Sequence, residues 1–173
     1  HRMFLWDNYP VNDNNPTMHL GPVTDRDPDL CEVVDGYMGN PLCKQNEINR
    51  VPLLTCLDYA WNPAAYDPSR SVGQAILHLA DTAPQRAVVK DLVEAYPGML
   101  IYGNGNTGFN AVQEQFARIS AMPHSRQAAL AYIEHLQQLS DRLKQQYPDR
   151  YQPEKQTLDN DIQSLKKKFA GKY

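Results

Sequence analysis

The chain has 173 residues, of which 42% are hydrophobic and 21% are charged, with a formal net charge of −3. This length suits one domain or one and a half, and the apolar content can form a buried core. Lys and Arg are not in excess, so we expect neither nucleic acid nor an anionic membrane surface as a partner. No apolar run approaches the ~20 residues that a membrane-spanning helix needs.

The first 62 residues alternate short apolar runs with polar loops, a pattern typical of strands. Residues 3–6 predict a buried strand, and residues 33–38 predict a second short strand that ends at 39–41. Between them, Asp27 and Pro28 predict the start of a short helix, because aspartate is a good N-cap and proline suits a first helical turn. The chain opens at His1 and enters the first strand almost at once, which is typical of the later part of a longer protein.

Residues 51–61 are apolar nearly all round, a pattern that periodicity alone assigns to neither helix nor strand. Ile48, Val51 and Leu54 fall at helical spacing, so we favour a buried helix. We expect a kink or restart at Pro52, where an amide donor is missing. Tyr59, Trp61 and Tyr66 follow, and we interpret them as packing the junction with the next region.

From residue 68 onward the pattern is helical, with two clear apolar stripes near the end of the chain. The last two helices read as an antiparallel hairpin in a bundle. The predicted helices span residues 69–80, 84–96, 109–122, 125–147 and 154–170.

The composition offers no metal or cofactor site. Cys31, Cys43 and Cys56 cannot all pair within one chain, and their spacing matches no zinc pattern. We interpret them as reduced thiols, which favours a reducing compartment such as the cytoplasm without establishing it. The glycine-rich stretch 103–108 lacks the Gly-Lys-Ser/Thr ending of a phosphate-binding loop. We therefore expect no metal and no cofactor.

One polar stretch, LWDNYPVND, follows the first predicted strand. Sugars are bound by carboxylates and amides that pair with hydroxyl groups, and by an aromatic wall against their apolar parts. Trp6, Asn8 and Asp13 supply both devices. Asn40 ends the second predicted strand, and the ends of neighbouring parallel strands converge. On the residues alone, a structural loop is the alternative interpretation.

Four motifs, in order over residues 3–71, carry a resemblance: FLWDNYPVND, HLGPVTDRDPDL, GYMGNPL and VPLLTCLDYAWNPAAYDPSRS. Together they closely resemble the late part of the catalytic domain of the family 84 glycoside hydrolases. These are the β-N-acetylglucosaminidases and protein O-GlcNAcases, some of them labelled hyaluronidases. After Ser71 the resemblance is only to a helical region that follows the catalytic barrel.

The resemblance implies an α/β fragment that is mostly α, with the last strands and helices of a (β/α)8 barrel (a TIM barrel) followed by a helical bundle. Residues 1–67 would be the C-terminal portion of the barrel, and residues 68–173 the bundle domain. The strands at 3–6 and 36–39 would be the seventh and eighth of the barrel, and 44–61 its last helix.

The resemblance also implies a retaining, substrate-assisted hydrolase that removes terminal N-acetylglucosamine from glycoproteins or glycans. In this family the acetamido oxygen of the sugar attacks its own anomeric carbon, and two adjacent aspartates act as acid and base. That pair lies upstream of the matching segment. This chain contains no Asp-Asp dipeptide, so we assign it no catalytic residue and expect the segment alone to be inactive.

What the resemblance carries over is sugar binding. Trp6 matches the aromatic wall of the acetamido pocket, and Asn8 an amide near the acetamido group. Asp13 matches the carboxylate that holds the outer sugar hydroxyls, with Asn40 assisting it. Asp7 and Asn12 belong to the local motif, but we do not expect them to touch the ligand.

Two other functions stay open at this point. The protein would be a non-catalytic glycan-binding relative if the upstream aspartates were lost. It would be a helical interaction module if residues 125–170 served to dimerise it. The expected partners are thus an N-acetylglucosamine-bearing glycan or glycoprotein, the upstream half of the barrel in the same protein, and a second copy of the bundle.

Overall fold

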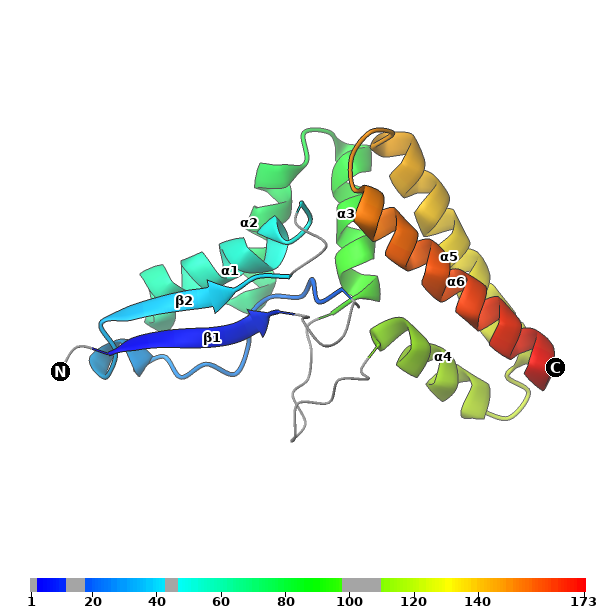
Figure 1. Ribbon diagram of the computed structural model, residues 1–173, viewed down its shortest axis with the longest axis horizontal. Helices are drawn as coiled ribbons and strands as arrows, with labels where there is room; N and C mark the ends of the chain where they lie inside the picture. The colour runs from blue at the N-terminus through cyan, green and yellow to red at the C-terminus, as the bar shows by residue number, and fades with distance from the viewer. Residues whose placement is uncertain (1–2, 12–17, 43–46, 98–109) are drawn as a thin grey trace.

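The computed structural model describes residues 3–11, 18–42, 47–97 and 110–173 (Figure 1). Two parallel strands, β1 (Phe4–Pro10) and β2 (Gly36–Asn40), form a small sheet at one end of the molecule. Among the described residues, six α-helices make up most of the rest. Both predicted strands are therefore present, and their parallel pairing is the one that a (β/α)8 barrel requires. The prediction that residues 3–6 are buried is wrong, because Met3, Phe4 and Trp6 are exposed.

The strand boundaries differ from the prediction for a local reason. β1 continues through the polar residues as far as Pro10. β2 begins only at Gly36, because the amides of Val33 and Val34 donate to the carbonyl of Leu30 and close a turn instead. The 3-10 helix η1 (Leu30–Glu32) supplies that turn.

The predicted helix start at Asp27 is wrong. η1 begins at Leu30, and Asp29 precedes it without a side-chain capping bond. Asp27 contributes its backbone instead: its carbonyl accepts from the amide of Leu30 at 3.2 Å and from the hydroxyl of Tyr59 at 2.6 Å.

The helix predicted at 51–61 is confirmed as α1 (Arg50–Trp61). The structure does not support a restart at Pro52. That residue lies in the first turn, where its missing amide would have no intrahelical acceptor, so proline is tolerated there. A short 3-10 helix, η2 (Pro63–Ala65), follows α1.

The five later helices are confirmed to within three residues at each end. Asp67, Thr82 and Asn110 cap three of them with side-chain oxygens that accept backbone amides. These helices are α2 (Pro68–Leu79), α3 (Ala83–Ala95), α4 (Ala111–Ala121), α5 (Arg126–Gln146) and α6 (Gln152–Lys172). The glycine-rich stretch 103–108 lies outside the described residues.

Helices α5 and α6 form the predicted antiparallel hairpin, which Figure 1 shows in yellow to orange for α5 and orange to red for α6. Near the turn, the rings of Tyr147 and Tyr151 meet edge to face with centroids 4.7 Å apart. Farther along, the hydroxyl of Ser140 donates to Asp159 at 2.6 Å. Within the described part of the chain, no helix is long and apolar enough to cross a membrane.

Among the described residues, a large apolar core joins segments from the first 67 residues to the helical bundle. Five fully buried side chains from the first 67 residues belong to the same cluster as the helical bundle: Met18, Leu20, Leu42, Ile48 and Val51. The amide of Leu20 donates to the carbonyl of Tyr96, and the amide of Ile48 donates to the buried carboxyl of Glu154. The division into domains at residue 67 stays a prediction.

The shared core predicts that residues 68–173, expressed alone, are helical but less stable than the whole chain. Removing the five covering side chains exposes apolar surface on the bundle. We expect the melting temperature to fall by roughly 10 °C, the size of a few kcal/mol in a domain of this length. Circular dichroism of both proteins measures this difference. Equal melting temperatures would show that the bundle does not depend on the shared core.

His19 gives a second prediction, on pH. Its ring is 1% exposed, and neither ring nitrogen has a partner among the described residues. Burial lowers the pKa of His19 from 6.5 to about 4, because desolvation disfavours the charged ring. Between these values the unfolded chain binds a proton that the folded chain does not. The stability that neutral His19 contributes is therefore complete above pH 6.5 and is lost as the pH falls toward 4.

Between pH 7 and pH 4, the free energy of unfolding of His19→Leu should fall by about 3 kcal/mol less than that of the wild type. Urea denaturation at several pH values measures it. His78→Leu, at an exposed position, is the control and should follow the wild type. Parallel pH profiles for His19→Leu and the wild type would contradict the assignment.

Candidate functional site

Strand β1 places alternate side chains on opposite faces of the sheet, as any strand does. Phe4, Trp6 and Asn8 are exposed on one face. Asp7 and Tyr9 are buried on the other, where α1 packs. The polar stretch that begins at Leu5 thus contains two alternating sets of residues, one exposed and one buried.

Three of the four predicted site residues meet on the exposed face. The indole Nε1 of Trp6 donates to Oδ1 of Asn8 at 3.1 Å. Nδ2 of Asn40, at the end of β2, donates to the same oxygen at 3.2 Å. The structure therefore brings Trp6, Asn8 and Asn40 together from two adjacent strands, while their role in binding stays a prediction.

The two bonds to Asn8 fix the orientation of its amide. Because Oδ1 accepts from both Trp6 and Asn40, the oxygen faces inward and the Nδ2 group is turned away from both partners. Asn8 therefore presents a hydrogen-bond donor to its surroundings. The indole of Trp6, 63% exposed, presents an apolar ring beside it.

The fourth predicted residue, Asp13, lies outside the described residues, as does Asn12. Asp7 is described and lies on the buried face. Its carboxylate binds the guanidinium of Arg26 and the hydroxyl of Tyr37, and it does not share the exposed face with Trp6. Arg26 and Tyr37 were missed from the sequence; the signal available was a lone arginine in the acidic run TDRDPDL.

The aromatic residues at the end of α1 and just after it differ in their exposure. Tyr59 is buried and its ring meets those of Tyr37 and Tyr66 edge to face, each pair with centroids 5.6 Å apart. Trp61 is 89% exposed, so the prediction that it packs the junction is wrong. Trp61 is the last residue of α1.

A hollow of about 310 Å³ lies beside Arg26, Tyr59 and Tyr66. None of Trp6, Asn8 and Asn40 lines it, so we do not assign it to the candidate site. Among the described residues, no group of His, Cys, Asp and Glu side chains could hold a metal ion. Cys31 and Cys56 are free thiols, and burial raises the pKa of Cys56 to about 11.

Comparison with known proteins identifies the family of the chain. The family described as beta-N-acetylglucosaminidase matches residues 1–94, which is more than half of the chain and includes both strands. The chain belongs to this family, the family 84 glycoside hydrolases. The match runs through α1 and α2 and into α3, beyond the residues that carry the resemblance in sequence motifs.

Two solved structures are similar in fold to this family 84 chain. The structure of CpGH84B matches 96% of the chain at 24% identity, with a TM-score of 0.57. A mutant O-GlcNAc hydrolase from Thermobaculum terrenum matches 97% of the chain at 24% identity, with a TM-score of 0.60. These likenesses confirm the predicted fold class. The chain spans 29% and 39% of the lengths of these two proteins.

The contact between Trp6 and Asn8 can be tested directly, because the chain has two tryptophans. In the Trp61→Phe background a single indole N–H signal remains. Asn8→Ala removes the acceptor of that N–H, so we expect the signal to shift and its hydrogen exchange to accelerate by about two- to tenfold. Asn160→Ala, exposed on α6, is the matched control. An unchanged indole signal in Asn8→Ala would contradict the described geometry.

Proposed function

We propose that this chain is part of a retaining, substrate-assisted β-N-acetylglucosaminidase that removes terminal N-acetylglucosamine from glycoproteins or glycans. The observation that carries the proposal is the convergence of Trp6, Asn8 and Asn40 at neighbouring strands in a chain of this family. In a (β/α)8 barrel, binding residues gather at the C-terminal ends of the strands.

The arrangement of the three side chains suits an acetamido sugar. Trp6 supplies an exposed ring against which the acetamido methyl group can pack. Asn8 presents a donor beside that ring, so the ligand group next to it must be an acceptor such as a carbonyl or carboxylate oxygen. Asn40 holds the Asn8 amide in this orientation. Asp13 is proposed to bind the outer hydroxyls of the sugar.

Catalysis needs groups that the chain does not contain. The substrate-assisted reaction uses the acetamido oxygen as nucleophile, one carboxylate to orient the acetamido group and another to protonate the leaving oxygen. We propose that these are an adjacent pair of aspartates upstream of residue 1, since the sequence has no Asp-Asp dipeptide. On this view residues 1–173 supply binding residues, and the segment alone does not hydrolyse the substrate.

The other features of the proposal concern organisation. Residues 1–67 would close the catalytic barrel and residues 68–173 would form a helical domain, with the upstream half of the barrel as partner. A homodimer through the helical domain remains a prediction, and light scattering of the full-length protein tests it.

The full-length protein should hydrolyse a chromogenic β-N-acetylglucosaminide. Asp13→Ala should weaken the binding of N-acetylglucosamine on the order of 10- to 150-fold, because a hydrogen bond to a charged group contributes roughly 1.5–3 kcal/mol. Asp149→Ala, an exposed aspartate in the turn before α6, is the matched control. Isothermal calorimetry and a colorimetric assay supply the two readouts.

The outcomes separate the candidate functions. Binding without hydrolysis by the full-length protein would favour a non-catalytic glycan-binding relative. If the wild type neither binds nor hydrolyses the sugar, the proposed function is wrong. Affinity unchanged by Asp13→Ala would remove that residue from the site and leave the assignment of the others standing.

A further inference from the structure

We infer that Asp7, Arg26 and Tyr37 are positioning residues, which hold Trp6 and Asn8 in register for the sugar from the opposite face of the sheet. The inference rests on the proposed function and concerns the same site. It assigns a role to three residues that do not face the ligand.

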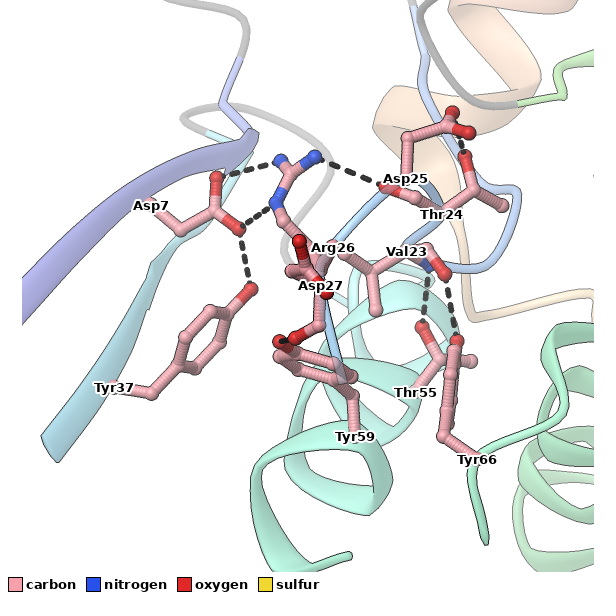
Figure 2. Close-up of polar contacts among 10 residues, drawn as sticks. All are labelled: Asp7, Val23, Thr24, Asp25, Arg26, Asp27, Tyr37, Thr55, Tyr59 and Tyr66. Carbon is pink, nitrogen blue, oxygen red and sulfur yellow. Dashed lines mark hydrogen bonds and ion pairs between the residues drawn. The ribbon is translucent and has the colours of Figure 1, made fainter. Parts of the chain in front are cut away.

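The carboxylate of Asp7 is held by three donors (Figure 2). Nε of Arg26 donates to Oδ2 at 2.7 Å and Nη2 donates to Oδ1 at 2.8 Å, a two-pronged pairing. The hydroxyl of Tyr37 donates to Oδ2 at 2.5 Å. Asp7 is 8% exposed, so its charge depends on these partners.

Each partner of Asp7 comes from a different segment. Tyr37 lies on the neighbouring strand β2, and Arg26 lies in the loop before η1. Arg26 is itself held, because its Nη1 donates to the carbonyl of Thr24 at 2.9 Å. The bonded carboxylate raises the pKa of Arg26, and burial together with Asp7 raises the pKa of Tyr37, so both stay protonated donors.

Asp7, Arg26 and Tyr37 are connected to α1 by a row of tyrosines (Figure 2). The row consists of Tyr37, Tyr59 and Tyr66. Tyr59 of α1 packs between Tyr37 and Tyr66 and donates to the carbonyl of Asp27 at 2.6 Å. Tyr66 donates to the carbonyl of Val23 at 2.8 Å, and the amide of Val23 donates to Thr55 of α1 at 3.0 Å. The loop that carries Arg26 is therefore fixed on both sides.

The strand needs this anchor because its ladder is interrupted where the site begins. Asp7 pairs with Gly39, but the next paired residue of β1 is Pro10, opposite Asn40. Asn8 and Tyr9 thus lie in an irregularity of the sheet, where backbone pairing alone does not set the direction of a side chain. Asp7 is the last regularly paired residue before it. Its two neighbours in sequence are Trp6 and Asn8.

Neighbouring residues of β1 therefore have different roles in the proposed site. Trp6 and Asn8 face the proposed ligand, while Asp7 fixes the backbone between them to α1 and to the loop. A displacement of a binding group lengthens and misaligns the hydrogen bonds that it makes to a ligand, which weakens them. Loss of the Asp7 anchor should therefore appear in sugar binding even though Asp7 does not touch the sugar.

Tyr37→Phe tests this with little risk to folding, since it removes one hydroxyl and keeps the ring. In the full-length protein we expect it to weaken binding of N-acetylglucosamine by about three- to tenfold. Tyr132→Phe is the matched control, because it also removes the hydroxyl of a half-buried tyrosine, but one that packs on the bundle core from α5 and lies outside the tyrosine row. It should bind the sugar as the wild type does. Asp7→Asn should weaken binding on the order of 10- to 100-fold, because it replaces the charged acceptor that holds Arg26 and Tyr37.

A second readout does not depend on ligand. In the Trp61→Phe background of the 173-residue chain, Tyr37→Phe should shift the indole N–H signal of Trp6, and Tyr132→Phe should leave it in place. A purely structural role would lower the stability of both variants alike and separate neither readout. If the wild type binds the sugar and Tyr37→Phe matches Tyr132→Phe in both measurements, the positioning role is overturned while the proposed function stands. If the wild type does not bind the sugar, both fall.

Discussion

The alternation of side chains along strand β1 determines which residues of the candidate site are exposed and which are buried. It divides four consecutive residues between a face that carries Trp6 and Asn8 and a face on which Asp7 and Tyr9 are buried. The buried face joins the strand to α1 through Arg26, Tyr37 and the row of tyrosines. A slip of one residue would exchange the two faces and place an unpaired carboxylate among the proposed ligand groups.

The second constraint is the core that both ends of the molecule share. Side chains before residue 67 are buried among those of the bundle, and backbone bonds from Leu20 and Ile48 reach Tyr96 and Glu154. The segments that follow β1 and β2 are therefore held by the bundle, while the sheet itself packs against α1.

The sequence allowed most of the fold and part of the site to be predicted. Long amphipathic stripes located α5 and α6, because this signal is local. The start of β2 was misplaced, since Val33 and Val34 have strand-like side chains but close the turn of η1. The burial of Asp7 also escaped prediction. Its partners lie 19 and 30 residues away, and only the folded chain brings them together.

The proposed function requires that Trp6, Asn8 and Asn40 form one wall of an N-acetylglucosamine site. A crystal structure of the full-length protein with N-acetylglucosamine tests it most directly. We expect the acetamido group to lie against the ring of Trp6, with an acceptor atom within hydrogen-bond distance of Nδ2 of Asn8. A sugar bound in the hollow beside Tyr59 and Tyr66, with the face of Trp6 empty, would contradict it.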